Sequence, residues 1–143
     1  LTKSSCQPLA NLAKKVRGEI KYHTMHANIW ISQLGQATDE SNIRMQAALN
    51  ECYPLALGIF EKSDYENVLI ETGVFDGEEL LQKVWTDIVT EVIEKSNLKM
   101  PDLDDAKLST LAFGGRKGYH TEYLQPLLDE MTEVYSIDPS AEW

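Results

Sequence analysis

The sequence contains little cysteine and no long apolar run. Its 143 residues include two cysteines, Cys6 and Cys52, which stand far apart with no Cys-x-x-Cys or Cys/His cluster around them. A disulfide framework and a zinc site are therefore unsupported, and reduced cytosolic thiols are expected. No apolar run approaches the roughly 18 residues that a membrane-spanning helix needs. We therefore expect a cytoplasmic protein with no membrane partner.

Positive charge is also scarce. The chain has 13 Lys and Arg residues against 23 Asp and Glu, which gives a net charge of −10 and argues against nucleic acid as a partner. Residues 1–36 carry five basic residues against Glu19 alone, whereas residues 37–143 carry eight basic against twenty-two acidic ones. A basic helix attached to an acidic body indicates contact with an acidic partner or an anionic ligand, and a solvated basic face is the alternative.

Apolar residues recur at helical spacing from the beginning of the chain. Pro8 suits a first helical position, and Gly35 suits a helix end. Between them, steps of three and four residues place one stripe along a helix of about 27 residues. The stripe consists of Leu9, Leu12, Val16, Ile20, His23, Ala27, Trp30 and Leu34. Lys14, Arg17 and Lys21 lie on the opposite side, and a helix of this length is typical of helix bundles.

The same pattern predicts a second helix. It begins with Thr38 or Asp39 as the N-cap, continues to about Phe60, and should be kinked at Pro54. Its expected inward residues are Met45, Ala48, Cys52, Leu55 or Ala56, and Ile59. Short connections between long helices favour antiparallel neighbours.

Two more helices are predicted after an acidic, turn-like segment at 62–76. Asp76-Gly77-Glu78-Glu79 is typical of a capping box and opens a helix that ends near Ser96. Residues 100–112 are expected to form a loop, and a last helix begins near Thr121. The expected inward residues are Leu80 or Leu81, Val84, Trp85, Ile88 and Val92 in the first of these helices, and Leu124, Leu127 or Leu128, Met131 and Val134 in the second. With no convincing strand pattern, the fold class is all-α.

Glu19, His23 and His26 are the first candidate site. At 100° per residue they lie within one narrow strip of the first helix, beside its apolar stripe. A carboxylate and two imidazoles are possible metal ligands. Carboxylate-bridged di-iron bundles place a Glu three residues before a His on each of two helices. Here the residues three positions before the three histidines are Ile20, His23 and Lys117, so a complete di-iron site is not predicted.

Three interpretations of this strip remain open. Glu19 and His23 form a hydrogen-bonded i, i+4 pair that satisfies a polar spot in the bundle, or the three residues are a degenerate metal site, or they are catalytic. We favour the first interpretation and assign neither metal ligands nor catalytic residues. No Ser or Cys nucleophile with a nearby base is evident.

The run Gly114-Gly115-Arg116-Lys117-Gly118 is the second candidate site. Glycines allow backbone amides to approach a ligand, and Arg116 and Lys117 supply positive charge just before a helix. A phosphate or carboxylate is one interpretation, and a flexible surface turn is the other. The spacing is not that of a P-loop or a dinucleotide-binding fingerprint, so neither a nucleoside triphosphate nor NAD is indicated.

These features resemble a known family, the C-type subunit of the ring-1,2-phenylacetyl-CoA epoxidase, a phenylacetic acid degradation protein. The resemblance covers essentially all 143 residues and about the C-terminal half of the family's usual chain. Its motifs are Glu19-Ile20-Lys21-Tyr22-His23, Trp30, Thr38-Asp39, Met45-Gln46-Ala47-Ala48, Gly114-Gly115-Arg116-Lys117-Gly118-Tyr119-His120-Thr121-Glu122-Tyr123-Leu124, Leu127-Leu128-Asp129-Glu130-Met131 and Trp143. Pro54, Pro126 and the acidic middle segment match the family loosely.

The resemblance implies a ferritin-like helical bundle, with residues 1–143 as the C-terminal part of a single domain and the upstream core helices absent. It implies a non-catalytic structural subunit of a multicomponent monooxygenase in aerobic phenylacetate catabolism. Its partner would be the homologous catalytic, A-type subunit, which holds the di-iron centre, while this one has no cofactor of its own. Phenylacetyl-CoA would be met only indirectly, with Arg116 and Lys117 as candidate contacts to CoA phosphates.

Two other functions remain as alternatives. One is a ferritin-like metalloprotein with its own di-iron or di-manganese site, and the other is a helical interaction module of another pathway. In each case we expect the apolar stripe of the first helix to need a cover, from partner chains, self-association or residues beyond 1–143.

Overall fold

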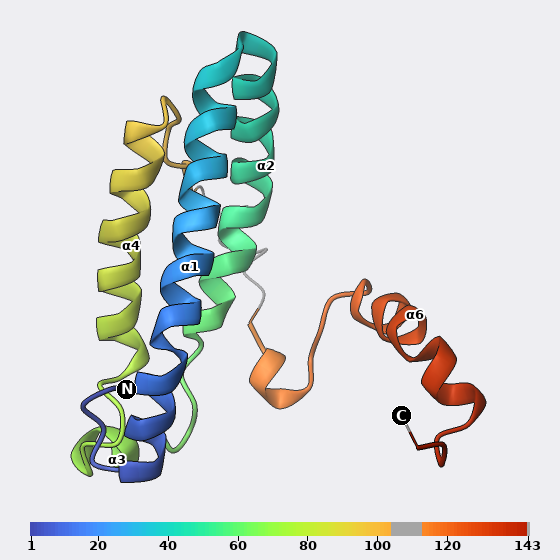
Figure 1. Ribbon diagram of the computed structural model, residues 1–143. Helices are drawn as coiled ribbons and strands as arrows, with labels where there is room; N and C mark the ends of the chain where they lie inside the picture. The colour runs from blue at the N-terminus through green and yellow to red at the C-terminus, as the bar shows by residue number, and fades with distance from the viewer. Residues whose placement is uncertain (104–112, 143) are drawn as a thin grey trace.

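The structure is a computed structural model that describes residues 1–103 and 113–142. The described part of the chain is helical and contains no strand, which confirms the all-α fold class. Three long helices stand side by side, α1 (Gln7–Ala37), α2 (Asp39–Leu57) and α4 (Glu78–Lys95) (Figure 1). The shorter elements are the 3₁₀ turn η1 (Gly58–Phe60), α3 (Glu66–Glu71), the 3₁₀ turn η2 (Gly115–Lys117) and α6 (Leu124–Ile137).

The predicted N-cap between α1 and α2 is confirmed at Thr38. The Thr38 hydroxyl accepts a hydrogen bond from the N–H of Ser41, and the Ser41 hydroxyl accepts one from the N–H of Thr38, both at 3.1 Å. These bonds satisfy backbone donors that the first turn of a helix leaves without partners. Because Thr38 alone separates the two helices, they pack as antiparallel neighbours.

Gly35 does not end α1, contrary to the sequence prediction, because the helix continues to Ala37. Gly35 is buried, and a Cβ atom there would lie 2.2 Å from the carbonyl oxygen of Ser96. The glycine therefore allows the end of α4 to approach the backbone of α1, a role that helix-end statistics do not reveal.

Three side-chain amides hold the segment after α4 against α1 and α2, and we call them the amide clamp: Gln36, Asn42 and Gln46. Gln36 donates to the Lys95 carbonyl at 2.9 Å. Asn42 donates to the carbonyls of Gly35 and Asn97, at 2.7 and 2.8 Å. Gln46 and Lys99 exchange two hydrogen bonds of 2.8 and 2.9 Å. The clamp satisfies the carbonyl of Lys95 in the last turn of α4, which lacks a helical partner, and the carbonyls of Asn97 and Lys99 just beyond that helix.

The segment at 62–76 is not turn-like throughout, because residues 66–71 form α3. The predicted capping box at Asp76 is also wrong. The N-cap of α4 is Gly77, which has a φ of 94° and no side-chain cap. The acceptor is instead the carboxylate of Glu66, whose Oε1 receives the N–H of Glu78 at 3.0 Å. This acceptor lies twelve residues before the donor, so a local sequence pattern could not indicate it.

Few apolar side chains are buried in the described structure: Ala10, Tyr53, Leu57, Ile93 and Leu98, with the two prolines Pro54 and Pro101. Trp85 joins them through ring contacts with Tyr53 and Phe60, at centroid distances of 5.7 and 5.3 Å. The core thus lies between α2, η1 and α4, with α1 adding the small residue Ala10 near its N-terminal end.

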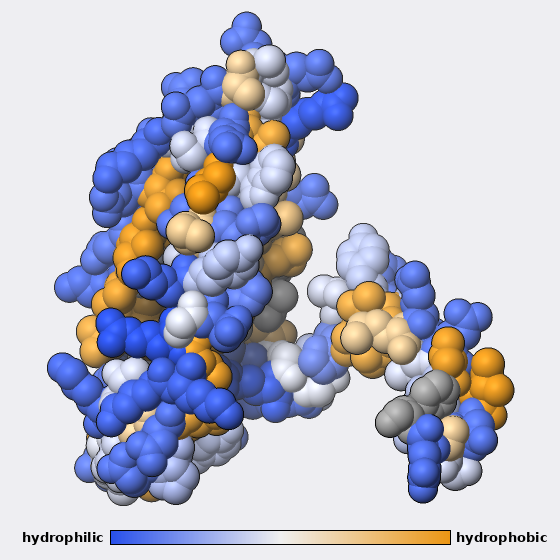
Figure 2. All heavy atoms as spheres, viewed as in Figure 1, coloured by the Kyte–Doolittle hydropathy of each residue, from blue (hydrophilic) through white to orange (hydrophobic). Residues whose placement is uncertain are grey.

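Many predicted inward residues are exposed instead. The exposed ones are Leu12, Val16, Ile20, His23, Ala27, Trp30 and Leu34 in α1; Ala48, Cys52, Leu55 and Ile59 around α2; Leu80, Leu81, Val84 and Ile88 in α4; and Leu127, Leu128, Met131 and Val134 in α6. Figure 2 shows apolar side chains on the surface between α4 and α1 and over α6. The periodicity located the helices correctly, but this chain does not supply neighbours for all of their apolar sides.

Two further sequence predictions concern the loop and the membrane. Most of the predicted loop at 100–112 lies outside the described residues. In the part of the chain that the structure describes, no helix is long and apolar enough to cross a membrane.

Gly35→Ala should lower the free energy of unfolding by about 1–3 kcal/mol, because the new methyl group would collide with the Ser96 carbonyl. Gly18→Ala is the matched control in the same helix, because a Cβ there meets nothing within 4 Å. It should raise stability by about 0.5–1 kcal/mol. Denaturant unfolding of both variants measures this, and equal effects would contradict the close approach.

Candidate functional site

The structure places Glu19, His23 and His26 on the exposed side of α1. The ring of His26 stacks on Tyr22, at 6.4 Å and 16°, and meets the edge of Trp30 at 6.2 Å. His23 contacts Tyr22 edge-on at 5.9 Å. No hydrogen bond joins Glu19 to His23 in the described structure, so the expected pair does not form. What the helix spacing brings together is an exposed row of rings, which we call the aromatic row: Tyr22, His26 and Trp30.

These three candidates do not fit a di-iron centre. They come from a single helix and are exposed, and within residues 1–103 and 113–142 no three His, Cys, Asp or Glu side chains are grouped to hold a metal ion. A carboxylate-bridged centre needs ligands that converge from several helices. A di-iron site built from the described residues alone therefore lacks its ligand set.

The second candidate, the glycine-rich run, is an ordered 3₁₀ turn. Gly114 and Gly118 flank η2 with φ values of 98° and 86°, a region that glycine enters at little cost. The carbonyl of Gly114 accepts the N–H groups of Lys117 and Tyr119, both at 2.9 Å. The turn thereby presents Arg116 and Lys117 in a fixed position.

Arg116 faces carboxylates of its own chain. Its guanidinium donates to the carboxylate of Glu78 in α4 and, at 3.3 Å, to the carbonyl of Ile59 in η1. The N–H of Gly114 donates to the carboxylate of Glu61 at 2.9 Å. We call these contacts of Gly114 and Arg116 the Arg116 latch. The latch joins the segment after residue 113 to the N-terminus of α4 and to the residues around η1.

Two buried carboxylates, Glu66 and Glu78, lie at the N-terminus of α4, next to the Arg116 latch. Glu66 is 5% exposed; its Oε1 caps α4, whereas Oε2 has no hydrogen-bond partner in the described structure. Glu78 is also buried and lies in the first turn of α4, where the helix dipole favours negative charge. Arg116 supplies the opposite charge that a nearly buried carboxylate requires.

The two cations of the loop are therefore not equivalent. An anion would have to compete with Glu78 for Arg116. The ammonium group of Lys117 stands 4.0 Å from the Asp64 carboxylate, and both side chains are largely exposed. The sequence indicated the basic loop but not Glu61 or Glu78, since nothing in their spacing connects them with loop residues 53 and 38 positions later.

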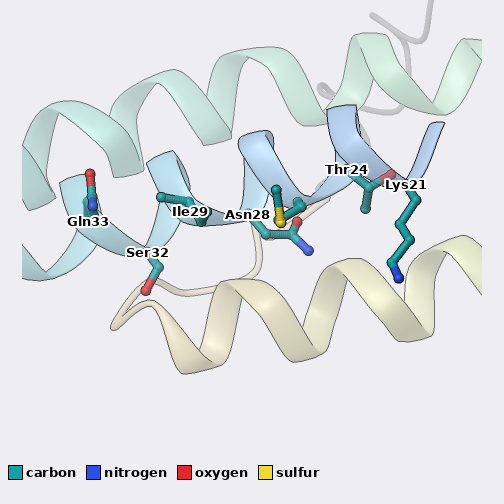
Figure 3. A pocket seen from close by; sticks show the side chains of 7 residues that line it. Lys21, Thr24, Asn28, Ile29, Ser32 and Gln33 are labelled. Atoms are coloured by element: carbon teal, nitrogen blue, oxygen red, sulfur yellow. The ribbon is translucent and has the colours of Figure 1, made fainter. Parts of the chain in front are cut away.

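Two open grooves accompany these sites. One, of ≈ 730 Å³, runs along α1 on the side of α4, toward which Lys21, Asn28 and Ser32 extend (Figure 3). The other, of ≈ 620 Å³, lies between α1, α2 and α4. Its lining is largely apolar and includes Ile31, Met45, Cys52, Trp85 and Ile88. Cys52 thus lines a groove and is not part of the closed core.

Arg116→Gln should lower the free energy of unfolding by about 1–2 kcal/mol, because it leaves the buried Glu78 carboxylate without its counter-charge. The effect stays below that of a fully buried pair, since Arg116 is partly exposed. Lys117→Gln is the matched control and should change stability by less than about 0.5 kcal/mol. Denaturant unfolding with amide exchange of residues 113–118 checks both, and similar values for the two would contradict the latch.

Comparison with known proteins agrees with these features. The sequence profile of the family described as phenylacetic acid catabolic protein matches residues 1–143. The C-type subunit of the 1,2-phenylacetyl-CoA epoxidase of Escherichia coli (strain K12) is 29% identical over 143 residues. That match covers the whole of this chain and 56% of the relative, so the chain spans little more than half of the relative's length. The all-helical structure is consistent with the ferritin-like bundle of this family. The chain belongs to the phenylacetic acid catabolic protein family.

Proposed function

We propose that this chain is part of a non-catalytic structural subunit of a multicomponent phenylacetyl-CoA epoxidase, and that it pairs with the catalytic, A-type subunit. The observation that carries the proposal is the orientation of Glu19, His23 and His26. They are the candidate metal ligands of α1, and all three are exposed in the described part of the chain. None of the three histidines has a Glu three residues earlier. Spacing and orientation both favour a scaffold.

The location of the cofactor follows from the same assignment of roles to the two subunits. In this proposal the di-iron centre belongs to the catalytic partner, and the present subunit holds none. The reaction takes place in the cytoplasm on that partner, and residues 1–143 are the C-terminal part of a single ferritin-like domain. This rests on the family and on the relative from Escherichia coli.

Exposed apolar surface supports a role in assembly. Large apolar side chains stand half exposed or more along α1, among them Leu12, Ile20 and Trp30. Soluble monomers rarely expose contiguous apolar patches larger than a few hundred Å². Covering these side chains with another polypeptide stabilises the assembly by about 1.5–3 kcal/mol for each one fully buried.

Contact with substrate would be indirect. Of the two basic residues in the glycine-rich loop, Lys117 is the better candidate for a CoA phosphate, because its ammonium group is exposed and its carboxylate neighbour lies at 4.0 Å. Arg116 would first have to leave the buried Glu78. An anion bound at this loop would therefore be held mainly as a point charge by Lys117.

Copurification of the full-length protein with the catalytic subunit from the same organism tests the pairing. The expected outcome is a stable complex whose iron stays with the catalytic subunit when the two are separated. The scaffold role is contradicted by a full-length protein that never binds this partner. Stoichiometric iron or manganese in the separated protein would favour the metalloprotein alternative.

His23→Ala and Glu19→Ala should leave the iron content of that complex unchanged, because neither side chain faces a converging set of ligands within the described residues. Metal analysis of purified complexes measures this. Lys83→Ala, an exposed change on α4, is the reference for handling losses. A selective loss of iron in either α1 variant would show that α1 supplies ligands.

A further inference from the structure

The groove of ≈ 620 Å³ between α1, α2 and α4, which we call the three-helix groove, has walls from three helices. Helix α1 packs against both α2 and α4 and stands between them in Figure 1. Ile31 of α1, Met45 of α2 and Trp85 of α4 each contribute to the lining. The three helices therefore form three sides of an enclosure, and the groove is its fourth side.

Two of the apolar stripes that the sequence predicts meet in this groove. Their members recur at steps of three and four residues along α2 and α4, and each of them lines the groove. They are Met45, Ala48 and Cys52 of α2, and Trp85, Ile88 and Val92 of α4. Ile88 nevertheless leaves 51% of its surface exposed. The two helices thus turn their predicted inward sides toward a space that the described residues do not fill.

The lining indicates the kind of group that would fill this space. Among the described residues that line the groove, none is charged. Ala27, Ala48 and Ala56 belong to the lining, and small side chains let a helix axis approach closely. A lining without charge is typical of a domain core or a permanent interface, whereas transient interfaces keep a polar rim. We therefore expect an apolar helix that stays in place.

The relative from Escherichia coli shows how much additional chain could supply such a helix. The match covers 56% of that relative, so about 44% of it, roughly 110 residues, lies outside the match. A helix of about 20 residues spans ~30 Å, which is enough to follow α2 along the groove. The additional length is several times what one such helix needs.

The first residues of the chain are held at the end of the bundle where α1 and α4 begin. The Ser5 N–H donates to the Gly73 carbonyl at 2.9 Å, and the Ser5 hydroxyl donates to the Thr72 carbonyl at 2.7 Å. Figure 1 shows this end of the chain beside α3. A segment that precedes Leu1 would therefore arrive at the ends of the same helices whose sides form the groove.

We propose that the three-helix groove is the seat of an apolar helix from the part of the full-length chain that precedes Leu1. This rests on the proposed function, in which residues 1–143 are the C-terminal part of a single domain. The seated helix covers Cys52 and Ile88 and turns three helices with an open side into a closed bundle. It stabilises the fold because the apolar surface that it covers leaves water. The catalytic subunit then contacts surfaces other than this groove.

Thiol labelling of the full-length protein tests this, because one cysteine lies inside the groove and one lies outside it. Cys52 and Cys6 are both exposed in the described structure, so an open groove would leave both reactive. Cys52 should react at least about tenfold more slowly than in the urea-unfolded protein, because labelling then requires local opening. Cys6 is the reference, and peptide mass mapping assigns each label. Reaction of Cys52 at the unfolded rate overturns the proposal.

Two controls identify the occupant. Protection of Cys52 should be the same at all protein concentrations and should not require the catalytic subunit. Protection that grows with concentration assigns the groove to a second copy, and protection that appears only with the catalytic subunit assigns it to that partner. Either outcome overturns this proposal, and the second leaves the scaffold role standing. A protein that protects Cys52 alone but never binds the catalytic subunit overturns the pairing instead.

A side chain that fills the groove gives a second test. Ala48 lines the groove, whereas the neighbouring Ala47 is exposed and does not line it. Ala48→Trp should lower the urea midpoint of the full-length protein by about 0.5 M or more, because its ring competes with the seated helix. Ala47→Trp, the matched control, should shift the midpoint by less than about 0.2 M. An Ala48→Trp midpoint equal to or above that of the wild type overturns the proposal, because a ring added to an open groove would cover Ile88. The labelling of the wild type does not depend on whether this variant folds.

Discussion

The contact between the backbones of α1 and α4 at Gly35 sets the arrangement of the three long helices. The Ser96 carbonyl occupies the space that a side chain would take at position 35. The amide clamp then fixes the end of α4 and the segment after it, through Gln36 of α1, which donates to Lys95, and Asn42 of α2, which donates to Asn97. Because the helices meet so closely at this end, their relative positions are determined there. The aromatic contacts of Tyr53, Trp85 and Phe60 fill the interior toward the C-terminal end of α2.

The parts that sequence could predict are those determined by neighbours along the chain. Helix α1 follows from apolar residues at steps of three and four, and the Thr38 cap follows from hydroxyl groups that reach backbone donors three residues away. The cap of α4 could not be predicted because its acceptor, Glu66, comes from a separate helix. The role of Gly35 escaped prediction for a related reason. From sequence alone, a glycine that ends a helix cannot be distinguished from one that allows another backbone to approach closely, because the opposing backbone is not known.

The inward side of each helix was harder to predict than the helix itself. Periodicity shows that α1 has an apolar side, but it cannot show which part of that side the same chain covers. The structure covers Ala10 and Gly35 and leaves Ile20 and Trp30 exposed. The basic loop was found in the same partial way. Composition located Arg116, whereas its carboxylate neighbour Glu78 belongs to a helix that begins 38 residues earlier and becomes visible only in the fold.

Two independent constraints bear on the strip of Glu19, His23 and His26. The first is spacing. Whether a Glu stands three residues before each His is fixed by the sequence and does not depend on packing, and here none does. The second is orientation, which depends on packing because α1 could have presented any side to α2 and α4. The side it presents carries Ala10 and Gly35, and the imidazoles stay outside among Tyr22 and Trp30. An imidazole that stacks on one exposed ring and meets the edge of another, on a helix rich in lysine, is suited to contact with another polypeptide. The features that count against a metal at this strip are therefore the ones that the scaffold proposal assigns to contact with a partner.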